Sequence, residues 1–236
     1  MQTKFKFITA LFALTALSLN MKAQTAPTPP TMPEPQSLPY TQDFGSFTGR
    51  TSTFPAGWQG WIVAKAVPSG KGGRINVPLT DHKIGGGTAA SAKTGLYDFN
   101  GKIGFLSAGS DLGLCLAINT TGKENVKVTF DAMTMRNLYD GVTKSSGFQY
   151  GLILQYRVGT ELTFTNLDYM PSAYNTGTVI QTSGKEGLNV VTGLNATLPA
   201  ACNNQPVVQI RWTAKAIIGE KPGERPSFAI DNVAVK

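Results

Sequence analysis

The stretch GFQYGLILQYRV, residues 147–158, alternates apolar and polar side chains along almost its whole length. The apolar positions, spaced two apart, are Phe148, Tyr150, Leu152, Leu154, Tyr156 and Val158. Gln149, Gln155 and Arg157 fall on the opposite face. A period of two over this length predicts a β-strand of an antiparallel sheet, with one face in the core and the other against solvent.

Two other stretches repeat this pattern. In NVKVTFDAMTM (125–135), the apolar side chains alternate with Lys127, Thr129 and Asp131. In PVVQIRWTA (206–214), Trp212 shares a face with two aliphatic residues and is expected in the core, while Gln209 and Arg211 point the other way. Both stretches are predicted to be half-buried strands.

The rest of the chain favours the same class of fold. Shorter strand-like runs are GWIVAKAV, TGLYDF, IGFLSA, LGLCLAIN, GTVIQT and LNVVTGL, and many of the 26 glycines lie between the runs. No stretch has the period of an amphipathic helix. Roughly ten short strands separated by turn residues predict an all-β protein, an antiparallel two-sheet β-sandwich.

The chain closes on RPSFAIDNVAVK, residues 225–236, where the apolar phase slips by one residue. Its larger apolar positions are Phe228, Ile230, Val233 and Val235. One explanation is a β-bulge at Asp231 and Asn232. The other is an interior strand buried on both faces, with Ala229 and Ala234 on the second side. Either predicts a closing strand that ties down the terminus.

The first residues have the pattern of a secretory signal. Lys4 and Lys6 precede an apolar run that is too short to span a membrane, and small Ala23 marks a cleavage zone. The prediction is a signal peptide over 1–23, a Pro-rich linker over 24–37 and one β-sandwich domain over 38–236. The protein is therefore expected to be exported, to the periplasm, the cell surface or the medium.

Charge argues against nucleic acid as a partner. Without Lys4, Lys6 and Lys22, 18 Lys and Arg face 14 Asp and Glu, a net charge of +4 with no basic run. A nucleic-acid-binding protein is expected to carry a dense basic patch or a recognised module. Such a mild excess favours acidic polysaccharides only weakly and without specificity.

The order of several motifs resembles a jelly-roll module of secreted bacterial proteins. The carrying stretches are LPYTQDFGSF and TFPAGWQGW near the start, TGLYDFNGKIGFLSAGS in the middle, and VVQIRWTAKAIIGEKPGERPSFAIDNVAV at the end. Modules of the choice-of-anchor and MAM-like (concanavalin-like) kind share this order, and the likeness runs from Leu38 to Val235. It implies an extracellular jelly roll that serves as a binding or accessory unit rather than a catalyst.

The same resemblance implies a structural calcium ion where the first and last strands meet. Asp43 in TQDF and Asp231 in AIDN are acids inside apolar strands, and Asn232 follows directly. A buried carboxylate needs a partner, and calcium prefers carboxylate and carbonyl oxygens. The alternative partners are backbone N–H groups or an arginine such as Arg50 or Arg225.

Candidate ligand-binding residues are aromatics, which stack on sugar rings. Those considered are Trp58 and Trp61 in PAGWQGW, Tyr139 in RNLYDG, and Tyr169 and Tyr174 in NLDYMPSAYN. The tyrosines lie in apparent loops, where binding residues concentrate. Cys115 and Cys202 form a tentative disulfide, which export permits, although two separate buried thiols are the alternative.

Catalysis is not expected. His82 is the only histidine, no G-x-S-x-G motif is present, and no acidic pattern of a strand-borne glycosidase is found. The predicted function is a secreted, non-catalytic module that binds carbohydrate or another cell-surface or extracellular polymer. The alternatives are a structural or adhesive protein–protein domain of the cell envelope, and a concanavalin-like hydrolase.

Overall fold

The structure is a computed structural model. It describes residues 29–50, 53–67, 73–86, 94–136, 149–161, 163–169, 188–218 and 226–236. The strands are β1 (Gln36–Ser37), β2 (Tyr40–Gln42), β3 (Trp58–Ala66), β4 (Arg74–Asp81), β5 (Ile84–Gly86), β6 (Gly95–Asp98), β7 (Ile103–Leu106), β8 (Ser110–Asn119), β9 (Lys127–Arg136), β10 (Gln149–Val158), β11 (Thr165–Leu167), β12 (Leu188–Thr197), β13 (Val208–Ile218) and β14 (Ser227–Val235). A 3₁₀ turn, η2, covers Ala200–Cys202.

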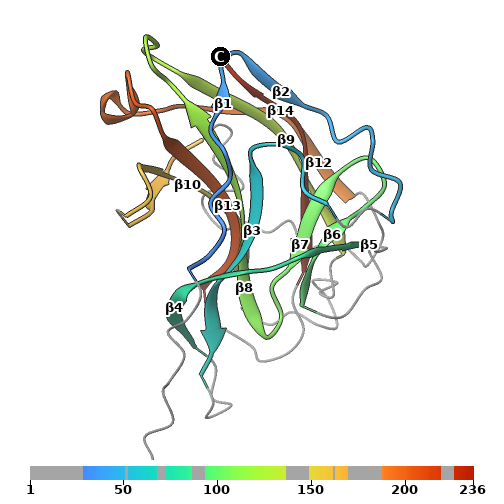
Figure 1. The fold of residues 1–236 in the computed structure, drawn as a ribbon. Helices are drawn as coiled ribbons and strands as arrows, with labels where there is room; N and C mark the ends of the chain where they lie inside the picture. The colour runs from blue at the N-terminus through green and yellow to red at the C-terminus, as the bar shows by residue number, and fades with distance from the viewer. Residues whose placement is uncertain are drawn as a thin grey trace, which may run out of the picture.

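The strands form two sheets that pack face to face as a β-sandwich, which confirms the predicted fold class (Figure 1). Sheet A has the order β11-β10-β13-β8-β3-β4, and β1 adds to it beside β8. Sheet B has the order β12-β9-β14-β7-β6-β5, and β2 adds to it beside β14. Most neighbours are antiparallel; the parallel pairs in the described residues are β1 with β8 and β5 with β6.

The core lies between the sheets and follows from the alternation seen in the sequence. In β13, Val208, Ile210 and Trp212 reach it, so Gln209 and Arg211 lie on the outer face of sheet A. Trp212 is 0 % exposed and stacks on Trp58 at 5.5 Å between ring centroids. Its core position is confirmed.

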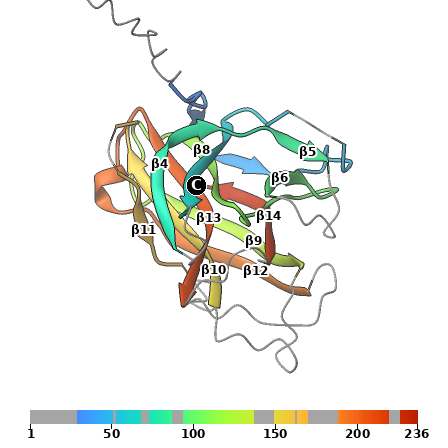
Figure 2. The same cartoon turned by 90° about the horizontal axis from the view of Figure 1, so that it is seen from below.

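Register brings two distant stretches together. Strands β10 and β13 pair antiparallel, with Leu154 opposite Trp212 in the core and Gln155 opposite Arg211 on the outer face. Figure 2 shows these strands side by side with β4 and β8 in the same layer. The polar faces of the two stretches thus become one surface.

The closing strand contains the predicted bulge. The pairing of β14 with β9 shifts register between Asp231 and Ala234, and Asn232 has φ = +48°. The shift turns Val233 and Val235 back into the core beside Phe228. Strand β14 is also interior, because β9 lies on one side and β7 and β2 lie on the other.

Part of the predicted linker packs on the domain. We call residues 31–37 the N-terminal strap; it includes β1. Thr31 donates its N–H to the Asp81 carboxylate at 2.8 Å, and its carbonyl accepts the Trp61 indole N–H at 3.2 Å. Gln36 pairs with Ile118 of β8. The strap therefore runs from the end of β4 to the end of β8 (Figure 1).

The predicted strands and the observed ones agree best where alternation was long. The run GTVIQT lies outside the described residues. Strand β4 is not among the predicted strands; its sequence, RINVPLTD, contains Pro78. It is an edge strand, where proline is tolerated. No helix in the described part of the chain has the length and apolar character needed to cross a membrane.

Candidate functional site

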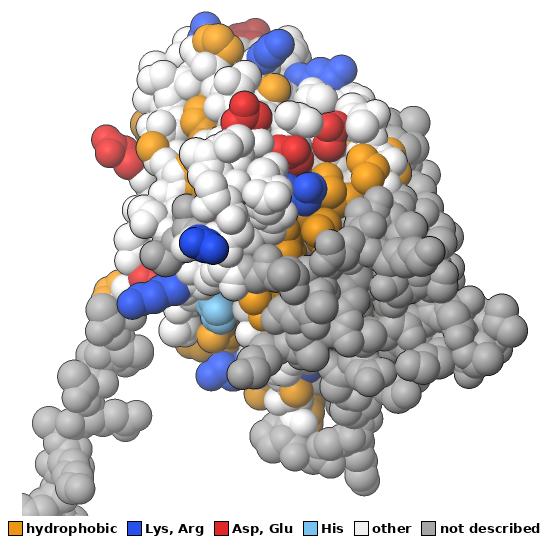
Figure 3. Space-filling view, turned by 90° about the vertical axis from the view of Figure 1, so that its right-hand side faces the viewer, with side chains coloured by type: hydrophobic (Ala, Val, Ile, Leu, Met, Phe, Trp, Pro, Cys, Tyr) orange, Lys and Arg blue, Asp and Glu red, His pale blue; other side chains and the backbone are white. Residues whose placement is uncertain are grey.

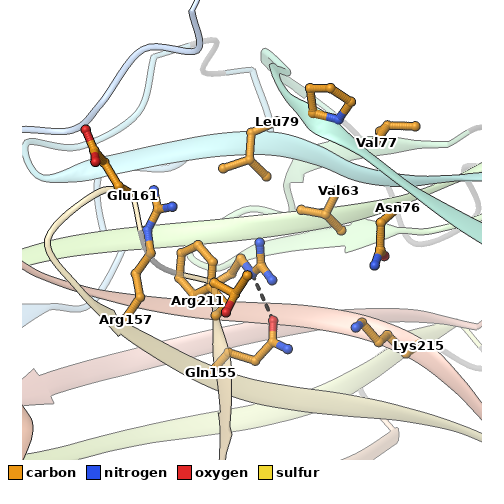
Figure 4. Close-up of a pocket in the computed structure, with 12 residues that line it drawn as sticks. Val63, Asn76, Val77, Leu79, Gln155, Arg157, Glu161, Arg211 and Lys215 are labelled. Carbon is orange, nitrogen blue, oxygen red and sulfur yellow. Dashed lines mark hydrogen bonds between the residues drawn. The ribbon is translucent and has the colours of Figure 1, made fainter.

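The outer face of sheet A carries a cleft of about 360 Å³. It is lined by Val63, Asn76, Val77, Pro78, Leu79, Gln155, Arg157, Glu161, Thr163, Phe164, Arg211 and Lys215. The lining comes from β3, β4, β10, β13 and the segment between β10 and β11, so the sheet curves around the space (Figure 4). The volume lies in the range of roughly 300–1,000 Å³ typical of ligand pockets.

Hydrogen bonds tie the polar side chains of the cleft together. Arg211 Nε donates to Gln155 Oε1 at 2.9 Å, and Gln155 Nε2 donates to Asn166 Oδ1 at 2.9 Å. Arg157 Nε donates to Gln209 Oε1 at 2.8 Å. Gln155 and Arg211 are 4 % and 8 % exposed. Because each group is held by a neighbour, the polar surface is preorganised.

Phe164 and Gly113 fix the position of Arg211. The Phe164 ring centroid lies 3.7 Å from Arg211 Cζ and 4.5 Å from Arg157 Cζ, so the ring packs on both guanidinium groups. A Cβ at Gly113 would lie 2.9 Å from Arg211 Cδ. Glycine at this position of β8 therefore makes room for the arginine stem across the sheet.

The strap borders the polar surface beyond Arg157. The Met32 sulfur accepts hydrogen bonds from Arg157 Nη2 at 3.8 Å and from Gln209 Nε2 at 3.7 Å. Trp61 lies beneath this region, with its ring centroid 5.8 Å from Arg157 Cζ. The strap thus covers part of the outer face that the cleft leaves free.

Burial lowers the pKa of each cation in the cleft. The pKa of Arg211 is lowered to about 10, mainly by burial, while Cys115 opposes the shift and Arg157 adds to it. Burial also lowers the pKa of Arg157. The pKa of Lys215 is lowered by burial first and by Arg211 second, while Asp111 opposes the shift. In all three side chains, burial disfavours the charged form, because the cleft supplies little negative charge to offset the loss of solvent.

The residues predicted to hold calcium do come close together. Asp43 and Asn232 line a second hollow of about 340 Å³ where β2 meets β14, and acidic side chains gather on one face of the molecule (Figure 3). Burial raises the pKa of Asp231, and Asp131 and Asp43 raise it further. Asp43 and Asp231 each accept a backbone N–H, from Gly45 at 2.9 Å and from Asn232 at 2.8 Å.

These bonds match the alternative that the sequence left open, in which the acids are satisfied by the backbone. Asn232 Nδ2 donates to Asp131 Oδ2 at 2.8 Å. In the described part of the chain, no three His, Cys, Asp or Glu residues are grouped so as to hold a metal ion. The calcium ion stays a prediction.

The predicted aromatic ligands do not form a site. Trp58 is 3 % exposed and belongs to the core. Tyr169 is also in the core rather than in an open loop, and its hydroxyl donates to the Leu152 carbonyl at 2.5 Å. Trp61 is fully buried under the strap, beside the cleft. Tyr139 and Tyr174 lie outside the described residues.

The tentative disulfide is wrong. Cys115 and Cys202 are both free and buried. Cys202 belongs to the core between the sheets, whereas Cys115 packs with Trp61 and Val63 on the outer face of sheet A. A sheet separates the two thiols, so they cannot bond without unfolding.

Sequence reasoning missed the cleft residues Gln155, Arg157, Arg211, Lys215 and Phe164 as ligand candidates. A signal was present, because alternation placed Gln155, Arg157 and Arg211 on the polar faces of two strands. Alternation by itself predicts only that these faces are exposed to solvent. The pairing of β10 with β13, which gathers them, joins residues 56 positions apart in the chain.

No protein-family model matches the chain, and no curated protein matches it. The resemblance to choice-of-anchor and MAM-like modules therefore has no support at the level of a family. Among solved structures, TmCBM61 in complex with β-1,4-galactotriose is 10 % identical, with a TM-score of 0.36 over 83 % of this chain and 94 % of that chain.

The K1 cleaved adhesin domain of Lys-gingipain from Porphyromonas gingivalis W83 is 15 % identical, with a TM-score of 0.38 over 84 % of this chain and 96 % of that one. Xylanase10C from Cellvibrio japonicus, in complex with xylopentaose, is 13 % identical, with a TM-score of 0.30 over 79 % of this chain and 28 % of the xylanase. At TM-scores below 0.5, none of these likenesses decides the function of this chain.

Proposed function

We propose that the protein is an exported, non-catalytic module that binds a carbohydrate chain in the cleft on sheet A. The lining carries this proposal: amide and guanidinium groups, fixed by hydrogen bonds to one another, stand beside the half-buried ring of Phe164. A specific ligand pocket typically combines apolar and aromatic surface with a small number of polar groups in fixed positions.

The composition of the lining favours binding over hydrolysis. Glu161 is the one carboxylate among the lining residues. Glycosidases of the usual kind place two carboxyl groups across the scissile bond, about 5–9 Å apart. His82 is not in the lining either; its Nδ1 lies 2.9 Å from the Lys83 carbonyl oxygen.

A pair of blocking variants tests the site. Asn76 and Thr41 are exposed strand residues, and they line the cleft and the second hollow respectively. We expect Asn76→Trp to abolish retention of the protein on polysaccharide-containing affinity gels, because the indole fills the cleft. Thr41→Trp should leave retention unchanged.

Failure of the wild-type protein to bind any polysaccharide in a broad panel would overturn the proposal. Self-association, or capture of a surface protein that Asn76→Trp leaves intact, would favour the adhesive alternative instead. Equal loss of retention in both variants would place binding outside the cleft.

Export is the other part of the proposal, and it is supported by the basic and apolar start of the chain. Expression of the full chain in a bacterial host should yield a mature protein in the periplasmic or culture fraction. Its intact mass should lack residues 1–23 or 1–24. A cytoplasmic protein that retains Met1 would contradict export.

A further inference from the structure

The cleft holds an excess of positive charge. Arg157, Arg211 and Lys215 line it, against the single carboxylate of Glu161, which is exposed. Asp111 also acts on Lys215, whose pKa it raises. Its carboxylate, however, forms a salt bridge with Arg74 at 3.0 Å, so its charge is already balanced. A ligand that enters the cleft therefore meets a field that favours anions.

Arg211 is a buried cation of the cleft that lacks a carboxylate partner among the described residues. It is 8 % exposed, and the described residues offer its guanidinium an amide oxygen and an aromatic ring but no carboxylate. A buried cation without a counter-ion is costly, and the structure retains it at the centre of a cleft. An anion from the ligand would supply the missing partner.

The geometry of Arg211 suits an oxyanion. Its Nε is occupied by Gln155, and Phe164 packs against the guanidinium group. Its two terminal nitrogens have no hydrogen-bond partner among the described residues and are left to the cleft, which Lys215 enters from the same strand (Figure 4). A fixed guanidinium fork binds carboxylate or sulfate oxygens in pairs, and a lysine beside it adds a point charge.

The floor of the cleft argues against a peptide as the ligand. Extended peptides commonly add to an unpaired sheet edge through their main chain. Here β3, β10 and β13, which line the cleft, each have a hydrogen-bonded neighbour strand on both sides. The edge strand β4 also lines the cleft, but it carries Pro78, which has no N–H to donate to a peptide. A sugar chain, which is recognised through its hydroxyl and acid groups, fits this surface better.

We infer that the cleft selects acidic glycans, with Arg211 and Lys215 binding the carboxylate or sulfate groups of the sugar chain. This inference rests on the proposed function and narrows it to a class of ligand. It assigns the charged side chains of β13 to ligand recognition, while Gln155 and Phe164 hold Arg211 in place.

Paired ligands test the inference. Polygalacturonate and its methyl ester share a backbone, but only the first carries charged carboxylates. Dextran sulfate and dextran likewise share a backbone, and only the first carries sulfate groups. By isothermal titration calorimetry at 0.15 M salt, we expect the charged member to bind at least tenfold more tightly than its neutral partner, as one charge-assisted hydrogen bond implies on the order of tenfold. The pair that shows the larger ratio identifies the acid group.

A matched pair of lysine variants tests the residues. Lys215→Met keeps the aliphatic stem and removes the charge, and Lys127→Met makes the same change on an exposed position of β9. We expect Lys215→Met to weaken binding of the charged glycan about tenfold and Lys127→Met to change it less than twofold. Arg211→Lys keeps the charge but loses the fork, and it should also weaken binding.

The outcomes separate this inference from the proposed function. Equal affinity for charged and neutral glycans would overturn the inference and leave the proposed function standing. No binding to any glycan would overturn both. Tighter binding to poly-L-glutamate than to every acidic glycan would show that the cleft is a peptide site. An equal loss of glycan affinity in Lys215→Met and Lys127→Met would show that net charge, rather than the cleft, determines binding.

Discussion

Single residues on sheet A are arranged around the side chain of Arg211. Gly113 is the clearest case, because a methyl group there would come within 2.9 Å of Arg211 Cδ and 3.2 Å of Val63 Cγ1. The position has a strand neighbour on each side, Trp61 and Thr213. The glycine is therefore required by the arginine rather than by a turn.

Gly113→Ala should displace Arg211 without removing any charge. We expect the affinity for acidic glycan to fall several-fold while the free energy of unfolding falls by only about 1 kcal/mol, since a flexible stem can shift. Gly85→Ala is the matched control, because a strand glycine with its nearest neighbour atom at 3.9 Å has room for the methyl group. An unchanged affinity for acidic glycan in Gly113→Ala would mean that binding does not depend on the position of the Arg211 side chain.

Tyr169 tests the distinction between a core tyrosine and a ligand-binding one. Its hydroxyl donates to the Leu152 carbonyl inside the core. Tyr169→Phe should lower the free energy of unfolding by about 1–2 kcal/mol in urea titrations and leave glycan affinity unchanged. Tyr156→Phe is the control, because Tyr156 is a partly buried tyrosine of β10, and it should change the free energy of unfolding little. A larger loss of stability in Tyr156→Phe than in Tyr169→Phe would put Tyr169 outside the core.

The calcium prediction is also decided at single residues. If an ion joins Asp43, Asp231 and Asn232, a chelator should lower the melting temperature of the wild-type protein by several degrees, and Asp231→Asn should remove that response. Equal melting temperatures with and without chelator would contradict the ion and leave backbone N–H groups as the hydrogen-bond donors to the two acids.

At the scale of elements, sequence patterns predicted strands well and their partners poorly. Strand β14 shows what is predictable: a phase slip of one residue indicates a bulge or an interior strand, and β14 has the bulge at Asn232 and a neighbour strand on each side. Strand β4 shows the limit, because an edge strand with Pro78 keeps no clear alternation.

The candidate site was less predictable for the same physical reason. Alternation states which face a side chain occupies but not which strand lies beside it, so the meeting of Gln155 with Arg211 across β10 and β13 was hidden. Phe164, which directly precedes β11, packs on the arginines of the sheet through contacts that no local pattern encodes. Loop-like sequence points instead to aromatic side chains such as Tyr169, which is buried in the structure.

The bulge in β14 gives an element-scale prediction. Asn232 adopts φ = +48°, a conformation that Asn and Gly tolerate and β-branched residues do not. Asn232→Gly can keep the positive-φ backbone conformation but loses the side-chain hydrogen bond to Asp131. Asn232→Val loses the hydrogen bond and also disfavours the positive φ. We expect Asn232→Val to be about 1–2 kcal/mol less stable than Asn232→Gly in urea unfolding. Equal stability of the two variants would mean that the bulge relaxes without strain.

On the scale of the whole molecule, the fold is held by one core between two sheets and by no covalent cross-link among the described residues. Both cysteines are buried, and burial raises the pKa of Cys115 to about 12 and that of Cys202 to about 11. The thiols should therefore be inert in the folded protein and reactive only after unfolding.

This placement predicts a loss of stability in alkali. A folded-state pKa above the unfolded value near 8.5 means that the stabilisation is complete below that pH and is lost as pH rises toward the folded pKa. Cys115 alone should remove about 2 kcal/mol between pH 8 and pH 10. Urea titrations should show this fall in the wild type and a smaller one in Cys115→Ala.

Thiol counting completes the test. Ellman's reagent should detect no thiol in the native protein at pH 8 and both thiols in denaturant, with the same melting temperature in the presence and absence of reductant. Fewer than two thiols after unfolding, or a fall in melting temperature with reductant, would restore the disulfide.

The placement of the three tryptophans has an optical consequence. Trp58 and Trp212 stack on each other in the core, while Trp61 alone lies on the outer face, next to Arg157 and Phe164. We expect an anion bound among the guanidinium groups to change the fluorescence of Trp61 more than that of Trp58 and Trp212, which then serve as an internal reference. Trp61→Phe should remove that change.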